Sequence, residues 1–257
     1  MKITLLGCGT SVGIPALGVI GWGKCNPKNP KNFRQRSSIL IENKGKTILV
    51  DAGPDVRNQL LNANIMNIDA VLITHGHADH ISGLPELRPF YFANKTKIPI
   101  YSNDLTLKQL KTQFEYLFKK GKTSPSYYKP PMTLNKIYYG KNTICGFDIK
   151  VLKQYHGNSN TLGFIFNNKF AYCTDVVDMP KSNFKYLKNM DLFIIGALRE
   201  EPHESHAHFK LAFDWSKKIN SKKTILTHLG VQSDYDYVSS ICPKNVFPGY
   251  DGMTFEL

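Results

Sequence analysis

The chain has 257 residues, of which 42% are hydrophobic and 21% charged, a balance that excludes intrinsic disorder. No stretch approaches the roughly 18 consecutive apolar residues of a membrane span, so we expect no membrane partner. The net charge is +13, and because only five of the 33 basic residues are Arg, the other 28 are Lys. Lys attracts anions over distance without fixing specific contacts, so a plain solvated surface and an anionic partner both stay open.

The five cysteines are scattered and contain no CxxC pair, which indicates a reducing, cytoplasmic location. Leu5-Leu6-Gly7-Cys8 is similar to a lipoprotein cleavage site. Only Ile3 to Leu6 precede its Gly-Cys pair, far fewer than the roughly 7–15 residues of a signal core, so we expect a first strand and no export signal. No linker, repeat or low-complexity block interrupts the chain, which predicts one domain over residues 1–257.

Short apolar runs predict strands along the chain. In order they are Lys2–Leu6, Ser37–Ile41, Thr47–Val50, Ala70–Thr74, Ile98–Tyr101, Ile149–Tyr155, Leu162–Phe166, Phe170–Thr174, Leu192–Ile195, Thr224–Thr227 and Met253–Glu256. The turn Asn167-Asn168-Lys169 predicts a tight hairpin, because Asn tolerates positive φ.

Helical patterns cover Val56–Ala63, Leu105–Phe118 and His208–Ile219, the first after a candidate N-cap at Asp55. Strands and helices mix without strict alternation, which favours stacked sheets with helices outside. The segment Gly121–Pro131, rich in Pro, Tyr and Lys, is either a surface connection or a flap over an anionic substrate.

The segment Ala70–His80, AVLITHGHADH, runs an apolar strand directly into a cluster of His and Asp. Four imidazole or carboxylate groups within six residues are costly to bury unless something binds them. At a strand end, His75 and His77 can point to one side, and Asp79 and His80 then follow on a turn. Imidazole and carboxylate without Cys suit an open Zn, Mn or Fe site better than a closed structural zinc site.

This HxHxDH pattern after an apolar strand resembles the metallo-β-lactamase fold. The resemblance implies an α+β protein, an αββα sandwich with a two-metal site at the sheet edges. Further ligands then follow three later apolar runs, in the order in which the family places them. The implied set, bridged by Asp175, is His75, His77 and His156 for one divalent ion and Asp79, His80 and His228 for the other.

Further blocks resemble the phosphodiesterase branch of that family, which includes ribonuclease Z and the cyclic-phosphate phosphodiesterases of the PhnP type. They span nearly the whole chain: Gly7–Pro15, Arg34–Glu42, Ile48–Leu61, Ile81–Phe90, Gly196–His206 and Tyr250–Met253. Glyoxalase-type thioesterases, which share the fold, lack the first and the last of these blocks.

Two departures separate the chain from members of that branch. Ribonuclease Z carries a long arm for transfer RNA between the positions of His156 and Asp175, where this chain has only 18 residues, 157 to 174. The short segment disfavours transfer-RNA processing and a large RNA partner. PhnP-type enzymes hold a structural zinc through an N-terminal Cys cluster and a His three places after the last ligand. Here only Cys25 and Val231 stand at those places, consistent with loss of that zinc.

The branch also implies a general acid, a His just before a helix that protonates the leaving oxygen. His206 is our candidate, with His203 and His208 as alternatives, and with Asp79 it forms the predicted catalytic pair. Arg199 and Arg36 are the predicted phosphate contacts, because both lie in family-like blocks and Arg is scarce. For each of the two, a structural ion pair is the alternative.

Taken with the resemblance, these features predict a hydrolase with two divalent ions, Zn or Mn, that acts on a small cyclic or diester phosphate. A hydroxide between ions roughly 3.5–4 Å apart then attacks phosphorus in line. One alternative is a thioester or lactone hydrolase on the same scaffold. Others are a ribonuclease-type protein or a nucleic-acid-binding protein whose metals serve structure. A homodimer, frequent in the resembling family, stays open.

Overall fold

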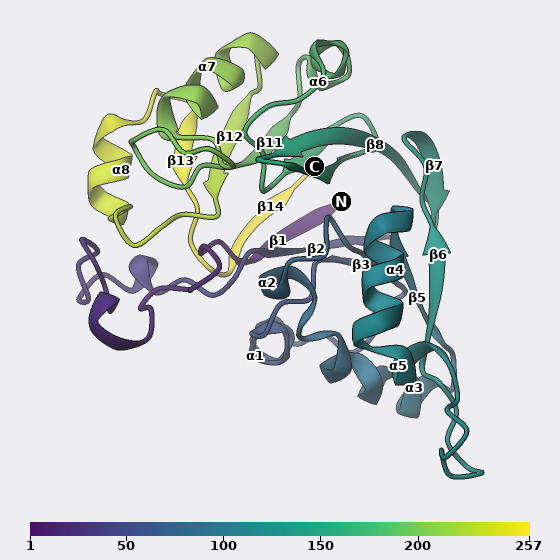
Figure 1. The fold of residues 1–257 in the computed structure, drawn as a ribbon. Coiled ribbons are helices and arrows are strands. Elements are labelled where there is room, and N and C mark those ends of the chain that lie inside the picture. Colours follow the sequence, from purple (N-terminus) through teal and green to yellow (C-terminus); the bar gives the residue numbers. More distant parts are fainter.

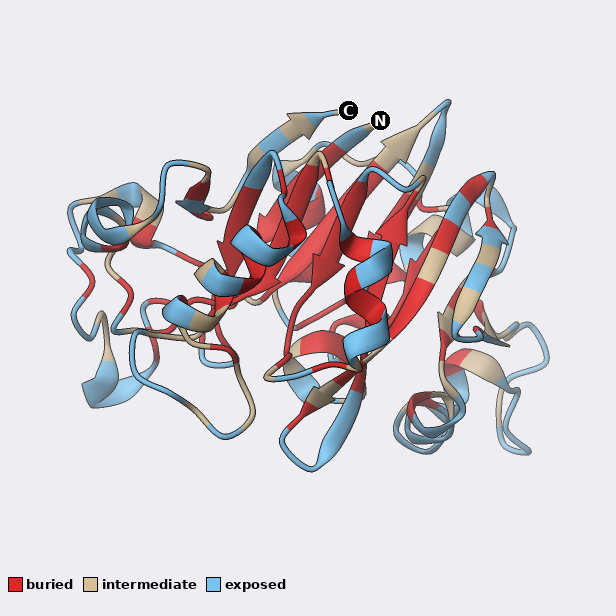
Figure 2. Cartoon of the chain, turned by 90° about the horizontal axis from the view of Figure 1, so that it is seen from above, coloured by how far each residue is buried: buried red, intermediate tan, exposed pale blue.

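The computed structural model describes all 257 residues of the chain. Two seven-stranded sheets face each other, and helices cover the outer face of each (Figure 1). One cluster of 22 buried residues fills the space between the sheets, and clusters of 17 and 20 lie beneath the outer helices. Figure 2 shows the strands as buried and the outer sides of the helices as exposed. The predicted αββα sandwich is confirmed.

The first sheet contains the N-terminal strands and the last strand of the chain. Its order is β14 (Met253–Glu256), β1 (Lys2–Gly7), β2 (Ser38–Asn43), β3 (Lys46–Val50), β4 (Ala70–Leu72), β5 (Ile98–Ser102) and β6 (Met132–Lys136). The helices of this half are α1 (Val56–Asn62), α2 (Ala78–Ile81), α3 (Arg88–Asn94), α4 (Asp104–Gln113) and α5 (Glu115–Phe118).

The second sheet contains the strands of the C-terminal half. Its order is β13 (Val246–Pro248), β12 (Lys223–Thr227), β11 (Leu192–Gly196), β10 (Phe170–Cys173), β9 (Ser159–Phe166), β8 (Phe147–His156) and β7 (Gly140–Ile144). Its helices are α6 (Phe184–Leu187), α7 (Phe209–Ile219) and α8 (Tyr235–Ile241). Short 3₁₀ turns occupy Gly18–Ile20, Pro30–Asn32, Leu84–Leu87 and Lys181–Asn183.

Both sheets follow the same plan, antiparallel strands first and parallel strands after. In the first sheet β1, β2 and β3 pair antiparallel, and β3 to β6 run parallel. In the second, β7 to β10 pair antiparallel and β10 to β13 run parallel. Parallel strands bring their carboxyl ends to one edge, where side chains from different strands can meet. The two chain ends lie side by side, with Met1 N 2.6 Å from Leu257 O (Figure 2).

Each predicted strand has a counterpart within a few residues, and the hairpin at residues 167–169 is confirmed, since Asn167 and Asn168 both have positive φ. Two helix details were wrong. The pattern over 105–118 breaks at Phe114, whose backbone leaves the helical region with φ −128°. Asp55 caps no helix, because its Oδ2 accepts the backbone N–H of Arg36 at 2.8 Å.

The segment 121–131 lies at a corner of the molecule beyond α3 and α5 (Figure 1). It is well separated from α2, which carries part of the predicted site, so it is a surface connection and not a flap over that site. None of the helices combines the length and the apolar character needed to cross a bilayer.

Candidate metal centre

The HxHxDH segment spans the step from β4 into α2. His75 and His77 lie on the extended connection, and His77 immediately precedes the helix. Asp79 and His80 occupy the first turn of α2, which brings both onto the side of the preceding histidines. His80 is fully buried and His75 almost so, while His77 is exposed. One short stretch therefore supplies groups at several depths of the same pocket.

Three further candidate ligands come from strand ends of the second sheet. His156 is the last residue of β8, Asp175 follows β10 and His228 follows β12. Asp175 and His228 adopt left-handed backbone conformations, with φ of 48° and 55°. Such conformations are strained for residues other than Gly, and they concentrate at functional sites. The sharp turn ends each strand and directs its side chain toward the first sheet.

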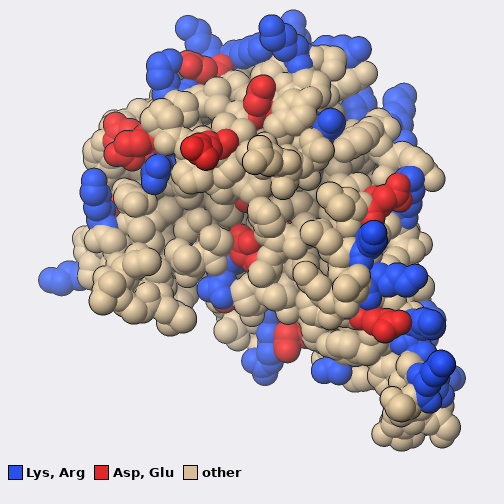
Figure 3. Space-filling model, in the orientation of Figure 1, with Lys and Arg blue, Asp and Glu red and all other residues tan.

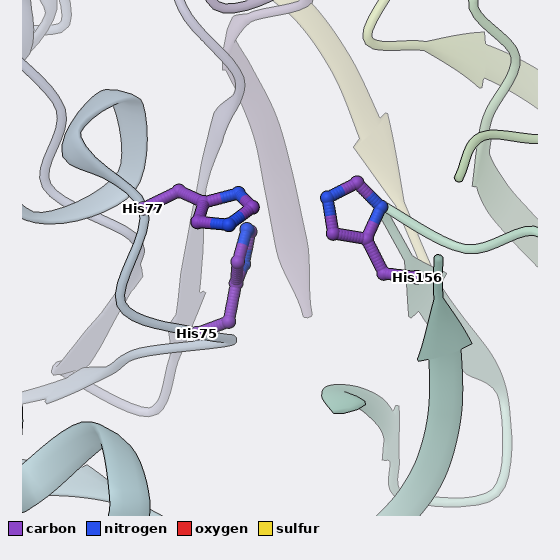
Figure 4. Close-up of side chains that lie close together, drawn as sticks. All are labelled: His75, His77 and His156. Carbon is purple, nitrogen blue, oxygen red and sulfur yellow. The ribbon is translucent and has the colours of Figure 1, made fainter. Parts of the chain in front are cut away.

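The predicted ligands assemble into two clusters. The donor atoms of His75, His77 and His156 lie within 4.8 Å of one another, and so do those of Asp79, His80 and His228. Figure 4 shows the rings of His75 and His77 facing His156 from the opposite sheet. The ring centroids of His77 and His156 are 5.1 Å apart.

Asp175 lies between the two clusters. Its Oδ2 is 3.2 Å from His80 Nε2 and 3.4 Å from His228 Nδ1. Its Oδ1 is 4.0 Å from His156 Nε2, in the other cluster. One carboxylate therefore offers an oxygen to each cluster, which is the arrangement that a bridging ligand requires.

The polar atoms in this pocket fit divalent cations. The Nε2 atom of His75 is buried without a hydrogen-bond partner, and the buried Nε2 of His80 faces carboxylate oxygens of Asp79 and Asp175, each 3.2 Å away. A buried polar atom without a partner is costly, and native structures contain few of them. A cation would satisfy both nitrogens, and a donor set of imidazole and carboxylate without thiolate suits Zn or Mn.

The pKa shifts reflect the proximity of opposite charges. Burial alone would raise the pKa of Asp175, but His228 and His80 outweigh it and hold that pKa well below its usual value. Burial would likewise lower the pKa of His80, yet Asp175 and Asp51 raise it well above the usual value. Both shifts have the same cause, which is the close approach of buried carboxylate and imidazole groups.

Asp51 is a functional position that the sequence analysis missed. It directly follows β3, is fully buried and has φ of 63°. Its Oδ2 is 2.7 Å from His80 Nδ1, and it accepts hydrogen bonds from the backbone N–H and the hydroxyl of Thr74. Asp51 thus orients His80 and fixes its tautomer. The sequence did contain a signal for Asp51, because it is a carboxylate directly after an apolar strand. The same kind of signal identified Asp175.

Other neighbours orient the remaining histidines. His156 Nδ1 lies 2.8 Å from the carbonyl of Ser205, so its Nε2 is free to face the cluster. The hydroxyls of Thr10 and Ser37 flank His228 at 3.4 and 3.3 Å. A Cβ on Gly7 would collide with the backbone carbonyl of Arg36. This close approach of the N-terminal strand holds the segment that carries Ser37 beside His228.

The three candidate general acids differ in their contact with the clusters. His206 Nδ1 is 3.7 Å from Asp175 Oδ1, and its ring stacks on His228 with centroids 4.7 Å apart. His203 lies one ring farther out, 5.2 Å from His206. His208 is the residue before α7 and joins neither cluster. Burial and the neighbouring His228 lower the pKa of His206 to about 3, so it is neutral at pH 7.

The two predicted phosphate contacts are engaged to different degrees. Arg36 Nε lies 3.1 Å from Asp55 Oδ2, with both side chains largely covered, which is the ion-pair alternative. Arg199 is more exposed: its Nη2 is 3.4 Å from the carbonyl of Pro202 and its Nε 4.0 Å from Glu201. Of the two, Arg199 is the guanidinium that is free to reach a ligand.

Cys25 and Val231 lie together, with the sulfur 3.5 Å from the Val231 carbonyl. Arg34 is buried beside them, only 1% exposed, and its Nη1 is 4.0 Å from the Cys25 sulfur. The same Nη1 donates to the carbonyl of Ser233 at 2.7 Å. A fixed guanidinium charge therefore connects the N-terminal loop to the loop after β12.

Comparison with known proteins identifies the family of this chain. The model of the beta-lactamase superfamily domain matches residues 46–229. An octanoyltransferase from Porphyromonas gingivalis is 31% identical over 257 residues, covering 98% of this chain and 51% of that protein. The chain thus spans about half the length of this relative. A ribonuclease Z from Methanocaldococcus jannaschii is 24% identical, covering 96% of this chain and 91% of that protein.

Solved structures agree with the fold. A diphosphatase of the PhnP family superposes with a TM-score of 0.90 at 29% identity, covering 100% of this chain and 96% of that one. The short form of human tRNase Z superposes with a TM-score of 0.71 at 18% identity, covering 100% and 99%, and supports the fold alone. The chain therefore belongs to the beta-lactamase superfamily and has the metallo-β-lactamase fold.

Proposed function

We propose that the protein is a phosphodiesterase that uses two divalent ions, Zn or Mn, to hydrolyse a small cyclic or diester phosphate. The observation that carries this proposal is the position of Asp175, which offers one oxygen to each cluster of candidate ligands. The similarity to a PhnP-family diphosphatase over the whole chain supports a phosphorus substrate.

The roles proposed for the residues follow from their positions. Divalent ions held by the two clusters would acidify a bound water and neutralise charge on a substrate oxygen. Asp79 and Asp175 supply the negative charge of the centre, and Asp51 holds His80 in place. His206 donates the proton to the leaving oxygen, provided that the bound phosphate raises its pKa from about 3. Arg199 is assigned to orient the phosphate because it lies in a family-like block and its guanidinium is loosely held.

The short connection between His156 and Asp175 supports a small substrate. His156 pairs with Ser159 across the β8–β9 hairpin, and β9 leads into β10 through the turn at residues 167–169. This stretch therefore contains only the hairpin strands and their turns, with no projecting arm. The net charge of +13 attracts a small anion from solution. The cytoplasmic location and the homodimer stay predictions.

The first test is hydrolysis of bis(p-nitrophenyl) phosphate by protein reconstituted with Zn or Mn, with Asp175→Ala beside it. We expect turnover in the wild type and none in the variant. Absence of turnover in a wild type that binds two metal ions would refute the phosphodiesterase proposal.

A second test separates the general acid from the other histidines. p-Nitrophenolate leaves without protonation, whereas an alkoxide needs a proton. His206→Ala is therefore expected to slow hydrolysis of an alkyl cyclic phosphate far more than that of the p-nitrophenyl ester. His203→Ala serves as the matched control and is expected to slow both equally or not at all. If His203→Ala, and not His206→Ala, selectively slows hydrolysis of the alkyl cyclic phosphate, His203 is the general acid.

A thioester hydrolase is the second candidate, because a relative 31% identical over the whole chain is an octanoyltransferase. Octanoyl-coenzyme A is the direct substrate to try. Thioester cleavage needs no phosphate-binding guanidinium at the reacting centre, so Arg199→Ala is expected to leave it unchanged while it lowers phosphodiester turnover. Thioester turnover far above phosphodiester turnover would favour this second candidate.

A further inference from the structure

A hollow with a volume of about 930 Å³ lies at the corner of the molecule formed by α3 and the segment 120–130. One wall comes from the end of α3 and the residues that lead into β5. The other wall is the Pro- and Tyr-rich segment between α5 and β6. Figure 1 places this corner away from α2, so the hollow is separate from the candidate metal centre.

The charged residues of the hollow are all positive. Lys95, Lys97, Lys120 and Lys129 line it, and no Asp or Glu does. None of these four forms an ion pair, as is true of most lysines in the chain, and Lys120 Nζ donates to the carbonyl of Ser126 at 3.0 Å. Figure 3 shows basic side chains gathered along this flank and at this corner. Four ammonium groups are therefore available to an anion with several charges.

Aromatic rings lie among these lysines. Tyr127 is 82% exposed and Phe92 is 54% exposed, and both line the hollow with Tyr91 and Tyr128. The hydroxyl of Tyr128 donates to the carbonyl of Tyr116 at 2.6 Å, which anchors the outer wall to α5. Large rings so exposed bury little surface within the chain itself. They offer flat apolar faces to a ligand beside unpaired positive charges.

We propose that this hollow binds single-stranded nucleic acid. Proteins that bind single strands combine a positive groove for the phosphates with aromatic faces on which bases stack. A bilayer presents a broad surface that cannot enter a hollow with two walls, whereas a flexible single strand can follow it. The proposal goes beyond the hydrolase reaction and does not depend on it, since the strand is a docked partner and not the substrate of the metal centre.

The aromatic part is tested with a fluorescein-labelled oligoadenylate of about 12 nucleotides, a length suited to a short groove, by fluorescence anisotropy. Tyr127→Ala is expected to weaken binding by about 5- to 100-fold, the loss of one stacked base, and Tyr127→Phe to keep it. Tyr138→Ala is the matched control, because Tyr138 is 63% exposed and lies beside Lys136, outside the hollow. Equal binding by all variants would overturn the proposal.

The electrostatic part is tested by salt dependence. Four phosphate contacts to a single strand predict a slope of log K against log salt of roughly −3. The double variant Lys95→Gln, Lys129→Gln is expected to halve that slope, whereas Lys210→Gln, Lys222→Gln removes the same charge elsewhere and is expected to change it little. An equal decrease of the salt slope in both double variants would show diffuse attraction by the whole surface and would overturn the proposal. Binding of phosphatidylserine vesicles that depends on Lys95 and Lys129, without binding of the oligoadenylate, would point to a membrane and also overturn the proposal.

Discussion

Four candidate ligands of the first half lie in one stretch of six residues, His75 to His80. The three candidate ligands of the second half, His156, Asp175 and His228, lie at the ends of separate strands. In the first half the cluster is local, and a strand followed by a helical turn assembles it. In the second half the ligands meet only because β8, β10 and β12 lie in one sheet that faces the first. A compact motif is therefore visible in sequence, and a dispersed one depends on strand order.

His77 and Asp175 differ in how firmly the structure holds them. His77 is exposed on its connection. Asp175, in contrast, is 1% exposed, and the hydroxyl of Thr161 donates to its carbonyl at 2.9 Å. Gln154 in turn donates to Thr161 and to the carbonyl of Thr174, each at 3.0 Å. This buried network holds the left-handed backbone at Asp175, so we expect substitutions around Asp175 to be tolerated less well than substitutions around His77.

The largest effect is expected at the residue that joins the two clusters. Asp175→Ala removes an oxygen from each, so bound metal is expected to fall below two ions per chain and kcat/KM to drop by at least about 1,000-fold. His77→Ala affects one cluster only, so the losses of bound metal and of kcat/KM are expected to be smaller. Elemental analysis and ester hydrolysis measure these effects. Asp191→Ala, a surface carboxylate paired with Lys222, is the control. A larger loss of bound metal and activity in His77→Ala than in Asp175→Ala would contradict the bridging role of Asp175.

A smaller effect is expected at Asp51, which acts on the metal centre through His80. An amide in Asp51→Asn cannot accept all the hydrogen bonds that His80 and Thr74 now direct to the carboxylate. Metal affinity is expected to fall by about 10- to 100-fold, the usual loss for such an orienting partner. Competition with a chromophoric chelator measures the dissociation constants. Unchanged affinity would show that the helical turn of α2 alone orients His80.

The buried network under Asp175 is expected to contribute mainly to stability. Thr161→Val has nearly the same shape but leaves the Asp175 carbonyl without its donor, which costs about 1–3 kcal/mol in the free energy of unfolding. The matched change in the first half is Ser82→Ala, whose exposed hydroxyl donates to the Ala78 carbonyl at 2.7 Å. We expect less than about 0.5 kcal/mol there. Urea denaturation of both variants tests the difference, and equal losses would contradict it.

The smallest effect concerns pH. Burial raises the pKa of Asp251 to about 7, although its oxygens accept the backbone N–H groups of Cys8 and Gln35. The folded state therefore binds this proton more tightly than the unfolded state. The resulting stability is full below about pH 4 and is lost as pH rises through 7, by about 0.7 kcal/mol between pH 6.5 and 7.5. Denaturation at both pH values should show the loss in the wild type. The same slope in Asp251→Asn would assign it to another group.

The elements that escaped prediction share a physical cause. β7 and β13 are edge strands, and β6 is another at the border of the first sheet. Edge strands are half-exposed, so sequences such as GKNTI in β7 lack a clear apolar run, although the fourth edge strand, β14, was predicted. The short helix α2 has only four residues and presents no helical period. The central strands are buried on both faces, and each one was predicted.

The amino-acid sequence by itself determined the fold family, the central strands and the candidate ligands, because apolar runs and their adjacent His and Asp are local features of the chain. Only the tertiary structure decided how these groups act on one another. It placed Asp175 between the clusters and Asp51 in hydrogen-bond contact with His80. It also paired Arg36 with Asp55 and placed His206, rather than His208, beside Asp175. Each of these is a contact between residues distant in sequence, set by sheet packing, so no local pattern records it.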